Sequence, residues 1–130
     1  MKTKWAWAIG GLCIVGAGAL ILPQVNNRIG MAEAAAAQSD EATMATLIRE
    51  FKHDCGRCPT TEEGFKALTS CPPGLNRSWN GPYTTKPFPN DPWANPYLYW
   101  SDGKRFKITS YGSDGQPGGD GDAADIVDTE

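Results

Sequence analysis

The sequence predicts an α+β fold in which a long N-terminal helix packs on a small antiparallel sheet. Three observations lead to this expectation. An uncharged run at residues 5–22 is followed by a second helical stretch at 26–53, and strand-like segments at 96–110 surround Asp102-Gly103, a dipeptide that favours hairpin turns. We therefore expect a membrane anchor helix at residues 1–25 and a head at residues 26–130.

Size and charge narrow the possible functions. The chain has 130 residues, which suits one domain, and a head of this size usually needs a disulfide, a metal or a partner for stability. The net charge of -3 argues against nucleic-acid binding, which requires a basic surface. The C-terminal end is a block of acidic residues, which is either a solvated tail or a site for a hard cation. Its members are Asp114, Asp120, Asp122, Asp125, Asp128 and Glu130.

The run from Trp5 to Leu22 is long enough to cross a bilayer as a helix, although at the short end of the usual range. Lys2 and Lys4 precede it, so the positive-inside rule places the head outside the cytoplasm. The alternative is a cleavable signal peptide. However, the small-residue pattern at 32–34 lies roughly ten residues beyond the apolar run, too far for a usual cleavage site. We expect an uncleaved, single-pass anchor.

The helix predicted at 26–53 carries one apolar stripe. Met44, Leu47, Ile48 and Phe51 recur at the spacing i, i+3, i+4 and i+7, which places them on one face. We expect this face to be buried against the head. Pro23 directly follows the apolar run, and because helix is predicted on both sides of it, it should kink the helix without ending it.

A short helix is predicted at 61–69. The segment from Thr60 to Glu63 fits a capping box, in which the Thr60 hydroxyl and the Glu63 carboxylate each bond the other's backbone N–H. Phe65 and Leu68 should point inward from this helix. A Pro/Gly-rich loop then leads to a hairpin at 96–110 and an acidic loop at 111–126.

The head contains three cysteines, for which three interpretations compete. A disulfide from Cys71 to Cys55 or Cys58 would suit an extracytoplasmic head with a small core, and we favour Cys55 as the partner. A zinc site would use the three cysteines together with His53. Redox catalysis by Cys55-Gly-Arg-Cys58 lacks the preceding strand that such motifs require. With a single His, no catalytic constellation can be assembled, so we expect a protein that is not an enzyme.

Several motifs of the head resemble one family. They are Cys55-Gly-Arg-Cys-Pro-Thr-Thr-Glu62, Gly81-Pro-Tyr83, Asp91-Pro-Trp93 and Asn95-Pro-Tyr97, followed by a Gly- and Asp-rich segment that ends at Ile126. In this order and spacing they resemble the major pseudopilin of type II secretion systems. The resemblance implies a pilin-like fold and a structural role in a type II secretion or pilus-type machine. It also implies a bacterial inner-membrane location with the head in the periplasm, and partners among other pseudopilin-like or secretion-machinery subunits, including further copies of itself.

The N-terminus departs from that family. Its members carry a Gly-Phe processing site and an early glutamate in the apolar helix, whereas here the aligned positions lie near Lys2 and Ala6. We therefore expect the N-terminus to remain unprocessed. A second hypothesis follows: a membrane-tethered extracytoplasmic binding module that retains the pseudopilin head without filament assembly.

In the resembled family a structural calcium ion occupies the C-terminal loop. The alternative for this loop is a disordered acidic tail. By position, the resemblance implies side-chain ligands from Asp114 and Asp125, with Asp122 as an additional or substitute ligand. Backbone carbonyls would come from Ser113, Gln116 and either Ser110 or Tyr111.

Overall fold

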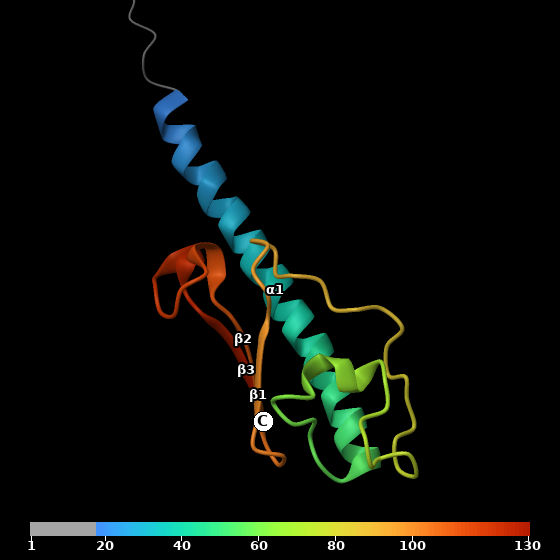
Figure 1. Cartoon of the computed structure of the whole chain (residues 1–130). Coiled ribbons are helices and arrows are strands. Elements are labelled where there is room, and N and C mark those ends of the chain that lie inside the picture. The colour runs from blue at the N-terminus through green and yellow to red at the C-terminus, as the bar shows by residue number, and fades with distance from the viewer. Residues whose placement is uncertain (1–17) are drawn as a thin grey trace, which may run out of the picture.

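The computed structural model describes residues 18–130, with side chains from residue 28 onward, and contains one long helix, three strands and three short 3-10 helices (Figure 1). Residues 1–17 of the predicted anchor at 1–25, which include most of the apolar run that begins at Trp5, lie outside the described residues. Within residues 18–130, no helix combines the length and the apolar character that a bilayer crossing requires.

Helix α1 (Gly18–Cys55) is longer than the predicted helix at 26–53 and continues through Pro23. Its C-terminal half packs on the head, whereas its N-terminal part extends away from it (Figure 1). Met44, Ile48 and Phe51 are at most 1% exposed, and Leu47 packs at the edge of the same core. The predicted apolar stripe is therefore the face of α1 that enters the core. Burying a side chain of this kind contributes about 1.5–3 kcal/mol each, which makes the stripe the main attachment of helix to head.

The sheet has three antiparallel strands in the order β1 (Leu98–Ser101), β2 (Phe106–Ser110) and β3 (Ile126–Thr129). β1 and β2 lie within the range predicted for the hairpin. β3 was not predicted, because residues up to 126 were assigned to an acidic loop. It pairs with β2 from Ser110↔Ile126 to Lys107↔Thr129, so the chain returns to the sheet after the loop. A long helix on a small antiparallel sheet is the α+β arrangement that the sequence predicted, and this fold class is confirmed.

The core lies between α1 and the inner face of the sheet. Phe106 and Ile108 project from β2 and are at most 1% exposed, while Tyr97 precedes β1 and is nearly buried. Tyr97 donates a hydrogen bond to Asp40 on α1 at 3.0 Å, so its polar end is satisfied while its ring fills the core. Leu68 of the short helix closes the core on one side.

The predicted capping box is present. The Thr60 hydroxyl accepts from the Glu63 N–H at 3.1 Å, and the Glu63 carboxylate accepts from the Thr60 N–H at 2.8 Å. The element that it opens is a turn followed by the 3-10 helix η1 (Gly64–Leu68), shorter than the predicted helix at 61–69. Arg57 adds two hydrogen bonds of 2.8 Å to the same Glu63 carboxylate, which ties the capping box to the end of α1.

One end of the edge strand β1 is covered by a side chain. The Thr61 hydroxyl donates to the Ser101 carbonyl at 3.1 Å and accepts from the Ser101 N–H at 3.0 Å. A single threonine therefore occupies both backbone positions that a neighbouring strand would use at this residue.

Candidate functional site

The acidic C-terminal loop is folded, and its shape comes from hydrogen bonds between its carboxylates and its own backbone. It contains the 3-10 helices η2 (Gly112–Asp114) and η3 (Gly121–Ala123). Asp114 accepts from the Gln116 N–H and Asp125 from the Gly118 N–H, each at 3.0 Å. These bonds bring the two ends of the loop together, because Asp125 lies seven residues beyond Gly118. The alternative of an unstructured acidic tail is not what the structure shows.

Glycine is required where the loop returns on itself. Gly112 has a φ of +65°, and a side-chain carbon there would approach the carbonyl oxygens of Asp122 and Ala124 to 2.8 Å. Gly119 has a φ of +89° and would meet the Ala123 carbonyl oxygen at 2.4 Å. Both the left-handed backbone and the lack of space exclude larger residues. The Gly-rich composition therefore serves to pack backbone on backbone, which gathers carbonyl oxygens inside the loop.

Ser110, at the end of β2, anchors the loop to the rest of the head. Its N–H donates to the Glu41 carboxylate on α1 at 3.0 Å, and its hydroxyl donates to Asp91 at 2.6 Å. The same hydroxyl accepts from the Gly112 N–H at 3.3 Å, and the Asn95 amide donates to the Gly112 carbonyl at 3.0 Å. The start of the loop is thus fixed by groups from the helix, from the sheet and from the turn at 91–95.

Glu41 is a site residue that the sequence did not indicate. Its side chain is 2% exposed, and this burial raises its pKa to about 7, with the negative charge of Asp128 acting in the same direction. The hydrogen bond from Ser110 opposes these effects. No local signal could have identified it, because Glu41 follows another acidic residue, Asp40, on the same helix and its partner lies 69 residues away.

The predicted calcium ligands fall into two groups. Asp114, Asp122, Asp125, Ser113 and Gln116 are exposed on the loop, whereas Ser110 is fully buried in the anchor described above. Across the described part of the chain, no three His, Cys, Asp or Glu side chains come close enough together to hold a metal. Calcium accepts backbone carbonyls as readily as carboxylates, so a site with two carboxylates and several carbonyls fits its chemistry.

The predicted disulfide is not formed in the structure. Cys55, Cys58 and Cys71 are all free thiols, and each contacts other groups. Cys58 is buried and donates to the Lys104 carbonyl at 3.5 Å, while the exposed Cys71 donates to the Pro72 carbonyl at 3.4 Å. Burial raises the pKa of the Cys55 and Cys58 thiols above the ordinary value, which opposes the thiolate form. Pairing of Cys71 with Cys55 or Cys58 stays a prediction for the oxidised protein. The zinc alternative is not supported, since no such cluster with His53 exists in residues 18–130.

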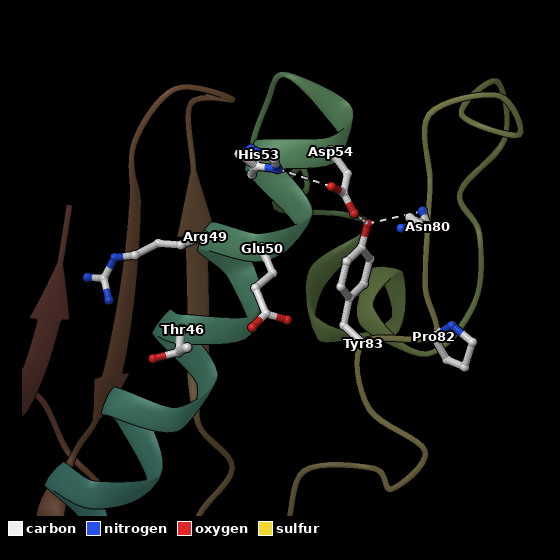
Figure 2. Close-up of a pocket in the computed structure, with 8 residues that line it drawn as sticks. All are labelled: Thr46, Arg49, Glu50, His53, Asp54, Asn80, Pro82 and Tyr83. Atoms are coloured by element: carbon white, nitrogen blue, oxygen red, sulfur yellow. Dashed lines mark hydrogen bonds and ion pairs between the residues drawn. The ribbon is translucent and has the colours of Figure 1, made fainter.

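A second candidate region is an open groove of about 610 Å³ beside the C-terminal part of α1 (Figure 2). Tyr83 donates to Asp54 at 2.8 Å, and the His53 ring lies 3.2 Å from the other oxygen of the same carboxylate. Burial raises the pKa of Tyr83 to about 12, and the bond from Tyr83 lowers the pKa of Asp54. The lining residues are Thr46, Arg49, Glu50, His53, Asp54, Asn80, Pro82 and Tyr83.

The polar groups of the groove form hydrogen bonds that hold parts of the fold together. The Asp54–Tyr83 bond joins the end of α1 to the turn at 80–83, and the Tyr83 hydroxyl also accepts from the Asn80 N–H at 3.2 Å. The His53 side chain is 88% exposed and bonds only its neighbour Asp54 among the described residues. A histidine in this setting neither faces a nucleophile nor is fixed by a buried partner, which are the features of a catalytic base.

A single long helix that extends beyond a small head, with an antiparallel sheet packed on its C-terminal half, defines the class of pilin-like proteins. The solved structure of the major pseudopilin from the type 2 secretion system of enterohaemorrhagic Escherichia coli superposes with a TM-score of 0.63 at 29% sequence identity. The match covers 81% of this chain and 93% of that one.

The chain belongs to the family of type II secretion system protein G, whose family model matches residues 24–129. The type II secretion system core protein G of Pseudomonas aeruginosa is 37% identical over 112 residues, covering 83% of this chain and 79% of that protein. The core protein G of Vibrio cholerae is 36% identical over 110 residues, covering 82% and 75%. The resemblance inferred from the head motifs is confirmed.

Proposed function

We propose that this chain is a structural subunit of a type II secretion pseudopilus and acts by packing against other subunits without catalysing a reaction. The observation that supports this role best is the uneven burial of α1. Its C-terminal half is buried in the head, whereas Ile29 and Met31 on the extending part are 51% and 69% exposed. A helix with exposed apolar residues and many alanines is marginally stable alone in water, so it requires neighbours.

In this proposal residues 1–25 hold the chain in the bacterial inner membrane, with the head on the periplasmic side. The apolar run at 5–22 and the preceding lysines support this orientation. Neighbouring copies and other secretion subunits would cover the exposed helix surface. A binding module without filament assembly would leave that surface uncovered.

The test is to place a photo-crosslinking amino acid at Ile29 of the full chain in its native membrane. Assembly predicts covalent dimers and higher oligomers of this chain. The same probe at Thr43, which is exposed on the part of α1 that carries the head, controls for random collisions. Equal and low yields at both positions would contradict assembly through the helix.

A structural calcium ion forms part of the same proposal. Asp114 and Asp125 would supply carboxylate oxygens, Asp122 a further one, and the carbonyls of Ser110, Ser113 and Gln116 the remainder. The acidic loop supports this assignment because it is already closed on itself. A divalent cation would also offset the repulsion among its carboxylates.

Melting the protein with calcium and with EGTA tests the ion. At a hundred times its dissociation constant, calcium should stabilise the head by roughly 2.7 kcal/mol. Asp114→Ala and Asp125→Ala should each remove most of the shift in melting temperature. Asp128→Ala is the matched control, because Asp128 lies in β3 and should leave the shift nearly intact. A wild-type melting temperature that is the same with calcium and EGTA would exclude the ion.

A further inference from the structure

The sheet has an outer face, directed away from α1, on which several large apolar side chains are exposed in the described part of the chain. The register places Leu98, Thr109 and Val127 in one row across the three strands, and Trp100, Lys107 and Thr129 in the next. Side chains alternate along a strand, so both rows lie on the face opposite to the buried Phe106 and Ile108. These two rows are called the outer sheet face below.

The outer sheet face consists of apolar and threonine side chains and contains one cation, Lys107. Leu98 is 40%, Trp100 is 50% and Val127 is 45% exposed, which makes them three of the five large exposed apolar side chains of the described residues. Thr109 is only 6% exposed between two of them, so the row is continuous across the sheet. Lys107 is exposed beside Trp100 and forms no ion pair within residues 28–130. A contiguous row of exposed apolar side chains that includes a tryptophan is typical of a contact surface, and the unpaired Lys107 at its side favours an acidic partner.

Positive charge continues from this face into the adjoining hairpin turn. Lys104 is exposed and unpaired in the described structure, while Arg105 is held by Asp102 at 3.2 Å. The acidic loop has the opposite character. Between residues 111 and 130 the chain carries six acidic residues and no basic one, and Asp120 and Asp122 are exposed without an ion pair in the described part of the chain.

These two regions lie at opposite ends of the head. The acidic loop meets α1 near Gly30, where a side-chain carbon would lie 3.0 Å from Asp122. The hairpin turn lies just beyond the end of α1, since the Cys58 N–H donates to the Gly103 carbonyl at 2.8 Å. From Gly30 to Cys55 the helix rises about 38 Å. Figure 1 shows the same separation, with the acidic loop beside the upper part of the head and the hairpin turn at its lower end.

We propose that the outer sheet face and hairpin turn of one copy, through Trp100, Lys104 and Lys107, bind the acidic loop of a second copy. This inference rests on the proposed assembly and names the surfaces that meet between heads. Parallel copies displaced along the helix by the length of one head bring opposite charges together. Pairing two outer sheet faces would place the Lys107 side chains of both copies in one interface that contains no acidic partner, which disfavours that contact. The contact joins two different surfaces and is therefore head-to-tail, and between copies displaced along the helix it extends as an open filament.

A photo-crosslinker at Trp100 of the full chain in its native membrane tests the contact. The expected product is a dimer of this chain whose cross-linked peptide lies within residues 114–122 of the second copy. Lys104→Glu with Lys107→Glu should reduce the dimer about tenfold, because like charges then meet. Adding Asp120→Lys to that variant should recover much of the yield. Melting curves of all variants check that the head remains folded.

The Ile29 probe separates failure of this contact from failure of assembly. Dimers at Ile29 without dimers at Trp100 would overturn the contact and leave the assembly intact. No dimers at either position would overturn both. A Trp100 adduct to residues 29–36 of another copy, to a different protein, or at a yield unaffected by the charge reversals would also overturn the contact with the acidic loop.

Discussion

The ion pair between Arg57 and Glu63 should stabilise the head more than its other ion pairs do. Glu63 accepts two hydrogen bonds of 2.8 Å from the Arg57 guanidinium and one of 2.8 Å from the Thr60 N–H. The two side chains are 31% and 20% exposed, so water screens the pair only in part. Exposed pairs contribute about 0.2–1 kcal/mol, and hydrogen bonds to charged groups about 1.5–3 kcal/mol. We expect a coupling free energy of about 1–2 kcal/mol, between these two ranges.

A double-mutant cycle with Arg57→Gln and Glu63→Gln measures this coupling. The assay is urea unfolding of the full chain in mild detergent, followed by tryptophan fluorescence of the head. The matched control is the same cycle on Arg105 and Asp102, whose side chains are 73% and 34% exposed. That pair should show a coupling of at most about 0.5 kcal/mol.

The pH dependence provides a second test of the same pair. The Arg57 guanidinium lowers the pKa of Glu63 below its ordinary value of 4.5. A depressed pKa means that the stabilisation is fully present above pH 4.5 and is lost as the pH falls through the folded-state pKa. The difference in unfolding free energy between wild type and Glu63→Gln should therefore shrink in acid. A coupling no larger than that of the control pair, or a difference independent of pH, would refute the reasoning.

Three other predictions concern buried groups. Glu41→Gln should stabilise the head at pH 8 in EGTA by up to about 3 kcal/mol, because the shift in pKa from 4.5 to about 7 disfavours the folded state once Glu41 ionises. This gain in stability should vanish below pH 4.5. The control Glu50→Gln, on the exposed side of α1, should show no gain at either pH. The measurement is the unfolding free energy of each variant at pH 8 and below pH 4.5. Ile48→Ala should destabilise the head by about 2–5 kcal/mol in urea unfolding, since Ile48 is fully buried, and a smaller loss would mean that the core collapses around the cavity. In the reduced native protein, alkylation followed by mass spectrometry should label exposed Cys71 well before buried Cys58, and equal rates would contradict the described burial.

Sequence patterns correctly predicted those parts of the fold that depend on interactions between residues close together in the chain. The stripe from Met44 to Phe51 follows from helical spacing, and the capping box from Thr60 to Glu63 is complete within four residues. β3 was missed because its four residues carry an aspartate and follow an acidic stretch. Its identity as a strand depends on pairing with β2, which begins 20 residues earlier in the chain, and no local pattern encodes that pairing.

In the candidate site, too, features of neighbouring residues could be predicted from the sequence, whereas contacts between distant segments could not. The acidic residues of the loop and its glycines were evident from composition. The anchor of the loop was not, because it joins Glu41, Asp91 and Ser110 from three separate segments. The cysteines were assigned to a disulfide from compartment and spacing alone, whereas the structure gives each thiol a separate environment.

The threonine that covers the end of β1 has a consequence for a protein that is concentrated among its own copies. An open strand edge can recruit any extended chain through backbone hydrogen bonds, and such pairing is indifferent to sequence. Thr61 occupies both backbone groups of Ser101, so another strand cannot extend the ladder past this point. Copies that meet at this end of β1 must therefore recognise one another through side chains and cannot add a strand there, which removes one starting point for amyloid-like pairing.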